Sequence, residues 1–116
     1  MSLTLHRSLA AGRWQELTLV EQLANIGSEV SRALRARAAG NEPRSAAALD
    51  RALELFDLTL ADARWQGRRR ELARAREIVV QHFFSATWGD DESLDGYFLP
   101  FAAAIATRHE TASSRG

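Results

Sequence analysis

Residues 46–62 read AAALDRALELFDLTLAD, and this stretch decides the fold. Its apolar side chains recur at alternating steps of three and four residues, which places them on one face of an α-helix. Leu55 and Ala48 widen this face, so the helix is apolar enough to need neighbours on more than one side. The stretch therefore predicts a helix inside a small helical bundle. Its stripe consists of Ala46, Leu49, Ala52, Leu53, Phe56 and Leu60.

Length and composition fit one domain with one hydrophobic core, because the chain has 116 residues and a mass of 12.9 kDa. Fifteen basic residues, all arginine, balance fifteen acidic ones, so the net charge does not favour a nucleic-acid or membrane-surface protein. The absence of cysteine excludes disulfides, thiolate metal sites and thiol catalysis. The N-terminal stretch lacks a long apolar run, so we expect neither a signal peptide nor a membrane anchor, and a cytoplasmic location.

Periodic apolar stripes predict further helices on both sides of this stretch. Thr18 and Glu21 have the spacing of a capping box, so the first helix should begin there. Gly40 suits the left-handed position after that helix, and Asn41 or Ser45 suits the cap of the next. The predicted helices cover about residues 18–38, 45–62, 68–86 and 93–108, with flexible ends at 1–13 and 110–116.

Four stripes joined by three short connections predict an all-α, up-down-up-down four-helix bundle. In this topology successive turns alternate between the two ends of the bundle. Trp14 and Trp65 should therefore lie at one end and Trp88 at the other.

The densest cluster of charge is a group of arginines around the turn before the third helix. Cations are disfavoured at a helix N-terminus, so these guanidinium groups should bind anions. RNA phosphates or the carboxylates of a partner are one source, and the nearby Asp57, Asp62 and Glu71 are the other. The cluster comprises Arg64, Arg68, Arg69, Arg70 and Arg74.

Arg76 lies between Leu72, Val79 and Phe83 on the helical wheel, inside the predicted core stripe. A buried guanidinium needs a partner, and Asp57 on the second helix is the best-placed acid. We therefore predict a buried ion pair between Arg76 and Asp57. The alternative is that the arginine side chain extends past the stripe to reach water.

Catalytic and metal-binding patterns are weak. Arg76 and His82 form an R-x5-H pair that is similar to the motif of HEPN-type ribonucleases, but about one such pair is expected by chance from this composition. The histidines His6, His82 and His109 show no metal-ligand spacing. We therefore expect no enzymatic activity, no metal and no small-molecule cofactor, and keep a ribonuclease as the third hypothesis.

Three segments carry a resemblance to a known group: LVEQLANIGSEVSRALRARAAGN at 19–41, RALELFDLTLAD at 51–62 and RELARAREIVVQHFF at 70–84. Together they resemble a conserved bacterial family of cytosolic four-helix bundles. That family is similar to the proteins encoded in 23S ribosomal RNA intervening sequences, which include the accessory variability determinants of diversity-generating retroelements. The resemblance spans about residues 17–107. It implies a ring, typically of five protomers, with RNA or an RNA-handling protein as a partner.

Two apolar side chains lie away from their own stripes. Leu58 points about 180° from Leu49, and Ile78 lies outside the stripe of the third helix. We expect both in contacts between subunits. The first functional hypothesis is therefore a non-enzymatic, homo-oligomeric interaction module, and the second is an accessory protein that binds nucleic acid through the cluster at Arg64–Arg74.

Overall fold

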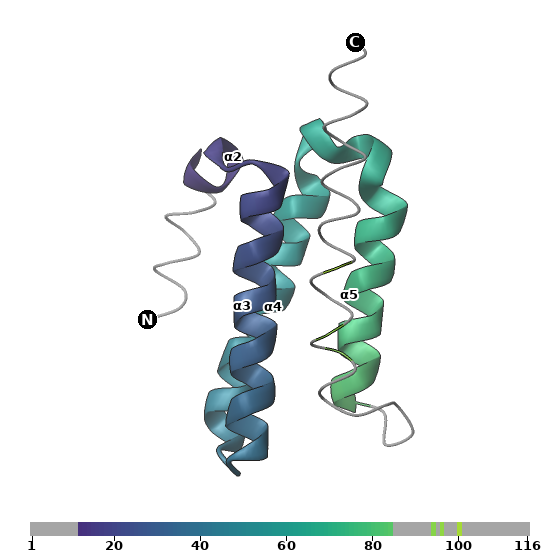
Figure 1. The fold of residues 1–116 in the computed structure, drawn as a ribbon. Helices are drawn as coiled ribbons and strands as arrows, with labels where there is room; N and C mark the ends of the chain where they lie inside the picture. The colour runs from purple at the N-terminus through teal and green to yellow at the C-terminus, as the bar shows by residue number, and fades with distance from the viewer. Residues whose placement is uncertain (1–11, 85–93, 95, 97–99, 101–116) are drawn as a thin grey trace.

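The computed structural model describes residues 12–84 together with 94, 96 and 100 (Figure 1). These residues form helices and turns without a strand, so the predicted all-α bundle is confirmed. The three long helices run in alternating directions (Figure 1). The elements are α2 (Trp14–Glu16), α3 (Leu19–Ala38), α4 (Glu42–Ala61), the 3₁₀ helix η2 (Ala63–Arg68) and α5 (Arg69–Phe84).

The start of α3 is fixed by the predicted capping box. The Glu21 backbone N–H donates to the Thr18 hydroxyl at 3.1 Å, and the Thr18 backbone N–H donates to the Glu21 carboxylate at 2.8 Å. Two amides that the first turn would leave unpaired are thereby satisfied. The backbone hydrogen bond from Thr18 also lowers the pKa of the Glu21 carboxyl below its ordinary value.

The turn between α3 and α4 also follows the predicted chemistry. Gly40 has a φ of 77°, the left-handed conformation that glycine adopts without a steric cost. Asn41 caps α4, because its side-chain oxygen accepts a hydrogen bond from the Arg44 backbone N–H. The helix starts at Glu42 rather than near residue 45, since Pro43 fits the first turn of a helix, where its missing N–H costs nothing.

The segment predicted as a turn at 63–67 is the 3₁₀ helix η2. Asp62 caps it through a hydrogen bond from the Arg64 backbone N–H to its carboxylate. Trp65 departs from helical geometry, with φ −107° and ψ 20°, and its ring is buried. This kink lets the chain reverse direction between α4 and α5 while the indole fills the end of the bundle.

The core lies between the inward faces of α3, α4 and α5. In α5 the buried side chains are Leu72, Ala75, Val79 and His82, so His82 rather than the predicted Phe83 completes the stripe. Phe83 is half-buried, and the Arg37 guanidinium stacks 4.5 Å from its ring centroid. The side chains with the lowest exposure include Leu23, Ile26, Val30, Ala52, Phe56 and Leu72.

A buried polar network closes the end of the bundle that holds Trp14 and Trp65, which confirms that these two tryptophans share one end. The Trp14 indole donates to the Thr59 hydroxyl at 3.1 Å, and the Trp65 indole donates to the Gln22 side-chain oxygen at 2.9 Å. The Gln22 amide donates to the Trp14 carbonyl at 2.8 Å and to the Asp62 carboxylate at 3.3 Å. This network ties α2 and η2 to α3 and α4.

Most of the predicted fourth helix at 93–108 lies outside the described residues, as do Trp88 and the end segments at 1–11 and 110–116. The described positions Leu94, Gly96 and Pro100 are helical, and Leu94 is buried in the same core as α3, α4 and α5. The fold is therefore the predicted four-helix bundle.

Candidate functional site

The predicted arginine cluster at Arg64–Arg74 does not converge on one site. Arg64 forms two close hydrogen bonds with Asp62, from Nη2 at 2.7 Å and from Nε at 3.0 Å, and its guanidinium lies 4.3 Å from the Trp65 ring centroid. The side-chain hydrogen bond with Arg64 holds the pKa of the nearly buried Asp62 carboxyl below its ordinary value and raises the pKa of Arg64. Arg64 is thus committed to the structure of the turn.

The other arginines of the cluster point to different surroundings. The Arg69 guanidinium Nε donates to the Leu60 carbonyl at 3.1 Å, which ties the start of α5 to the end of α4. Arg68 is half-buried, whereas Arg70 and Arg74 are exposed on α5. Arg70 and Arg74 lie one turn apart on α5.

The predicted pair of Arg76 and Asp57 forms, but the prediction that it is buried is wrong. The Arg76 Nε lies 3.0 Å from the Asp57 Oδ1, with side-chain exposures of 32% for the arginine and 61% for the aspartate. Arg76 sits at the edge of the α5 core face, where its long side chain reaches along α4 to water. The pair therefore links two helices at the surface instead of neutralising a charge in the core.

Leu58 and Ile78, the predicted subunit contacts, are half-buried within the protomer. Both pack against the edge of the core, so each leaves less apolar surface in water than the sequence suggested. The large apolar side chains with the highest exposure among the described residues are Val20 at 48% and Phe84 at 74%. The predicted role of Leu58 and Ile78 in assembly stays a prediction.

The R-x5-H pair does not form a joint site. His82 is 4% exposed and faces the core of the bundle, whereas Arg76 is paired with Asp57 on another side of α5. Six residues along a helix correspond to a separation of about 120° around its axis, which agrees with these two directions. Within the described part of the chain, no group of three or more potential ligating side chains is placed to hold a metal ion.

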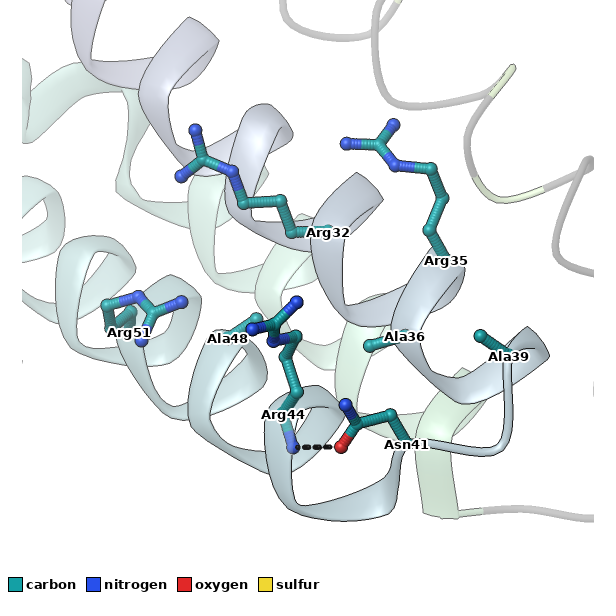
Figure 2. A pocket seen from close by; sticks show the side chains of 8 residues that line it. All are labelled: Arg32, Arg35, Ala36, Ala39, Asn41, Arg44, Ala48 and Arg51. Atoms are coloured by element: carbon teal, nitrogen blue, oxygen red, sulfur yellow. Dashed lines mark hydrogen bonds between the residues drawn. The ribbon is translucent and has the colours of Figure 1, made fainter.

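A cleft between α3 and α4 is lined by four arginines that the sequence did not connect (Figure 2). Arg32 and Arg35 come from the C-terminal half of α3, and Arg44 and Arg51 come from the N-terminal half of α4. The cleft has a volume of about 560 Å³. We call it the arginine cleft; Ala36, Ala39, Asn41 and Ala48 complete its lining.

One acid holds two of these arginines in place. Glu29, whose side chain is 11% exposed, accepts a hydrogen bond from the Arg51 Nε at 2.8 Å and pairs with the Arg32 Nη1. The Glu29 carboxylate therefore links Arg32, one turn further along α3, to Arg51 on α4. No pattern within α3 singles out Glu29, because its burial depends on α4 covering that side of the helix.

The remaining two arginines of the cleft are Arg35 and Arg44. Among the described residues, neither Arg35 nor Arg44 has a side-chain hydrogen bond or ion pair. A signal for the cleft did exist in the sequence. Arg35 and Arg44 lie at nearly equal distances on either side of Gly40, and positions equidistant from the turn of an antiparallel helix pair become neighbours.

Comparisons with protein-family models, with curated proteins and with solved structures yield no match for this chain. Of the helices that the structure describes, none combines the length and the apolar character needed to span a membrane.

Proposed function

We propose that this protein is a non-enzymatic interaction module that assembles with copies of itself. The observation that carries the proposal is the outward side of α4, which bears exposed Ala61 within one turn of the half-buried Leu58 and exposed Ala47 about three turns earlier. Ala46, which the sequence placed in the core stripe, is exposed as well. Small side chains let another helix approach closely. Covering a half-buried leucine in a subunit contact stabilises the assembly by about 25 cal/mol for each Å² of apolar surface removed from water.

Ile78 supplies a second patch on a different helix. A ring is built from head-to-tail contacts, which need two different patches on each subunit. Leu58 on α4 and Ile78 on α5 meet this need, because both are apolar and neither is fully covered within its own protomer. The family resemblance favours five subunits, and we place the assembly in the cytoplasm.

Sedimentation of the full chain with a Leu58→Asp variant tests the proposal. The wild type should sediment as an oligomer at micromolar concentration, and Leu58→Asp should shift it to a monomer with unchanged helical circular dichroism. Val20→Asp is the matched control, because it places the same charge on another partly exposed apolar position, near the N-terminus of α3, where an acid is favourable. A wild-type monomer, or equal effects of the two variants, would contradict the proposal.

The resemblance also points to RNA or an RNA-handling protein as a partner of this module. The cluster at Arg64–Arg74 gives this alternative weaker support, because Arg64 and Arg69 already bind groups of the protein itself. If RNA bound through this cluster, an Arg70→Ala, Arg74→Ala double variant should lose salt-dependent retention on immobilised RNA.

A further inference from the structure

The arginine cleft carries an excess of positive charge that the described residues do not neutralise. Four arginines line the cleft, and among the described residues only the carboxylate of Glu29 pairs with any of them, through Arg32 and Arg51, which leaves an excess of three positive charges. The C-terminus of α3 and the N-terminus of α4 meet here, and their partial charges have opposite signs. The excess therefore comes from the side chains and is not an effect of one helix end.

The arrangement of the four arginines is suited to an anion that spans several contacts. Glu29 fixes Arg32 and Arg51 from opposite helices, while Arg35 and Arg44 remain available to a ligand. Each guanidinium can donate two parallel hydrogen bonds to a phosphate group. Figure 2 shows that the four side chains come from two helices, which makes the cleft a composite site.

The lining indicates which part of a ligand would be recognised. It consists of arginine, alanine and one asparagine, without an aromatic ring on which a base could stack. A volume of about 560 Å³ admits a small molecule or a short piece of a polymer. The contacts on offer are therefore charge-assisted hydrogen bonds to phosphate oxygens, which carry no information about base sequence.

We propose that the arginine cleft binds an anion that carries several phosphate groups, with Arg35 and Arg44 as the direct contacts. Arg32 and Arg51, which Glu29 positions, line the other end of the cleft and add to its positive electrostatic potential. The phosphate groups can come from a free polyphosphate or from the backbone of single-stranded RNA. This site is independent of Leu58, which lies two turns beyond Arg51 on α4 and outside the cleft.

Titration of the full chain with two probes tests this assignment: inorganic triphosphate by calorimetry, and a labelled oligouridine by fluorescence anisotropy, both at low salt. Arg35→Ala and Arg44→Ala should each weaken binding about tenfold or more, as expected when one charge-assisted contact is lost. The matched control is Arg13→Ala, which removes the same charge from an exposed position at the start of α2, at the opposite end of α3 from the cleft, and should change binding less than about twofold.

The two probes also separate the sources of phosphate. If triphosphate binds saturably and with an affinity at least equal to that of oligouridine, the ligand is a small polyphosphate. If oligouridine binds much more tightly and its affinity falls steeply with salt, the ligand is RNA. Equal losses in the cleft and control variants would show a diffuse charge effect and overturn the assignment. The assignment would also be overturned if neither probe bound. It would likewise be overturned if the cleft variants changed the sedimentation of the protein but left its binding of phosphate intact.

Discussion

Gln22 is the residue on which the tryptophan end of the bundle depends. Its amide oxygen accepts from the Trp65 indole, and its amide nitrogen donates to the Trp14 carbonyl and to Asp62. A side chain that carries both an acceptor and a donor is required to join these groups. Glutamine at this position therefore pairs the buried Trp65 indole N–H, while Thr59 pairs that of Trp14.

Gln22→Leu should destabilise the protein by about 1–3 kcal/mol, because it leaves the buried Trp65 N–H without its acceptor. Urea unfolding followed by circular dichroism measures this loss. The control is Gln66→Leu, the same substitution at an exposed position of η2, which should change stability by less than about 0.5 kcal/mol. Equal stabilities of the two variants would show that the network does not contribute.

Asp62 should make part of the stability dependent on pH. Arg64 lowers the pKa of the folded-state carboxyl below its ordinary value of 3.8. A lowered folded-state pKa gives stabilisation that is present above the unfolded-state pKa and is lost as pH falls through the folded-state pKa. Asp62→Asn should therefore reduce the melting temperature at pH 7, and the difference from wild type should shrink below pH ~4. Asp50→Asn, at an exposed position of α4, should show no such difference.

Arg76 makes a surface ion pair, so its removal should cost little. With the Asp57 side chain 61% exposed, water screens the pair, and Arg76→Ala should destabilise by about 0.2–1 kcal/mol. The buried pair predicted from the sequence would instead cost about 3–5 kcal/mol. Thermal unfolding distinguishes the two values, since each kcal/mol shifts the midpoint by several degrees in a domain of this size.

At the scale of elements, the two glycines next to helix ends differ in what they require. Gly40 has a φ of 77°, whereas Gly67 lies outside the left-handed region, and a Cβ atom would meet no other atom at either position. Gly40→Ala should therefore destabilise by about 1 kcal/mol through backbone strain alone. Gly67→Ala should be neutral or stabilise by up to about 1 kcal/mol, because it reduces the freedom of the unfolded chain. Chemical denaturation of both variants checks that the free energy of unfolding falls in Gly40→Ala and does not fall in Gly67→Ala.

The elements themselves could be predicted from local patterns. The capping box at Thr18, the left-handed Gly40 and the cap at Asn41 are short-range features, and all three are present. The helical period could not show which residues at the edges of an apolar stripe are buried, because their burial depends on how the neighbouring helices pack. His82 is therefore buried where Phe83 was expected.

At the scale of the whole molecule, features that join two helices were hard to predict. The pair of Arg76 and Asp57 was found because one charge on an apolar stripe demands a partner. The arginine cleft was missed because its four arginines lie outside the apolar stripes, where an arginine needs no explanation. The polar network at the tryptophan end joins residues more than forty positions apart, such as Trp14 and Thr59, which a local pattern does not reveal.

The same difference in sequence separation sets an order of events for folding. The hydrogen bond from Ser45 to the Ala33 carbonyl closes a loop of only 12 residues around Gly40, whereas the Trp14 bond to Thr59 closes one of 45. Short loops lose less entropy on closing, so the α3–α4 hairpin should be the nucleus and the tryptophan end should consolidate after the rate-limiting step. The network around Gln22 would then act mainly by slowing unfolding, which makes it a determinant of how long the folded chain persists rather than of how fast it forms.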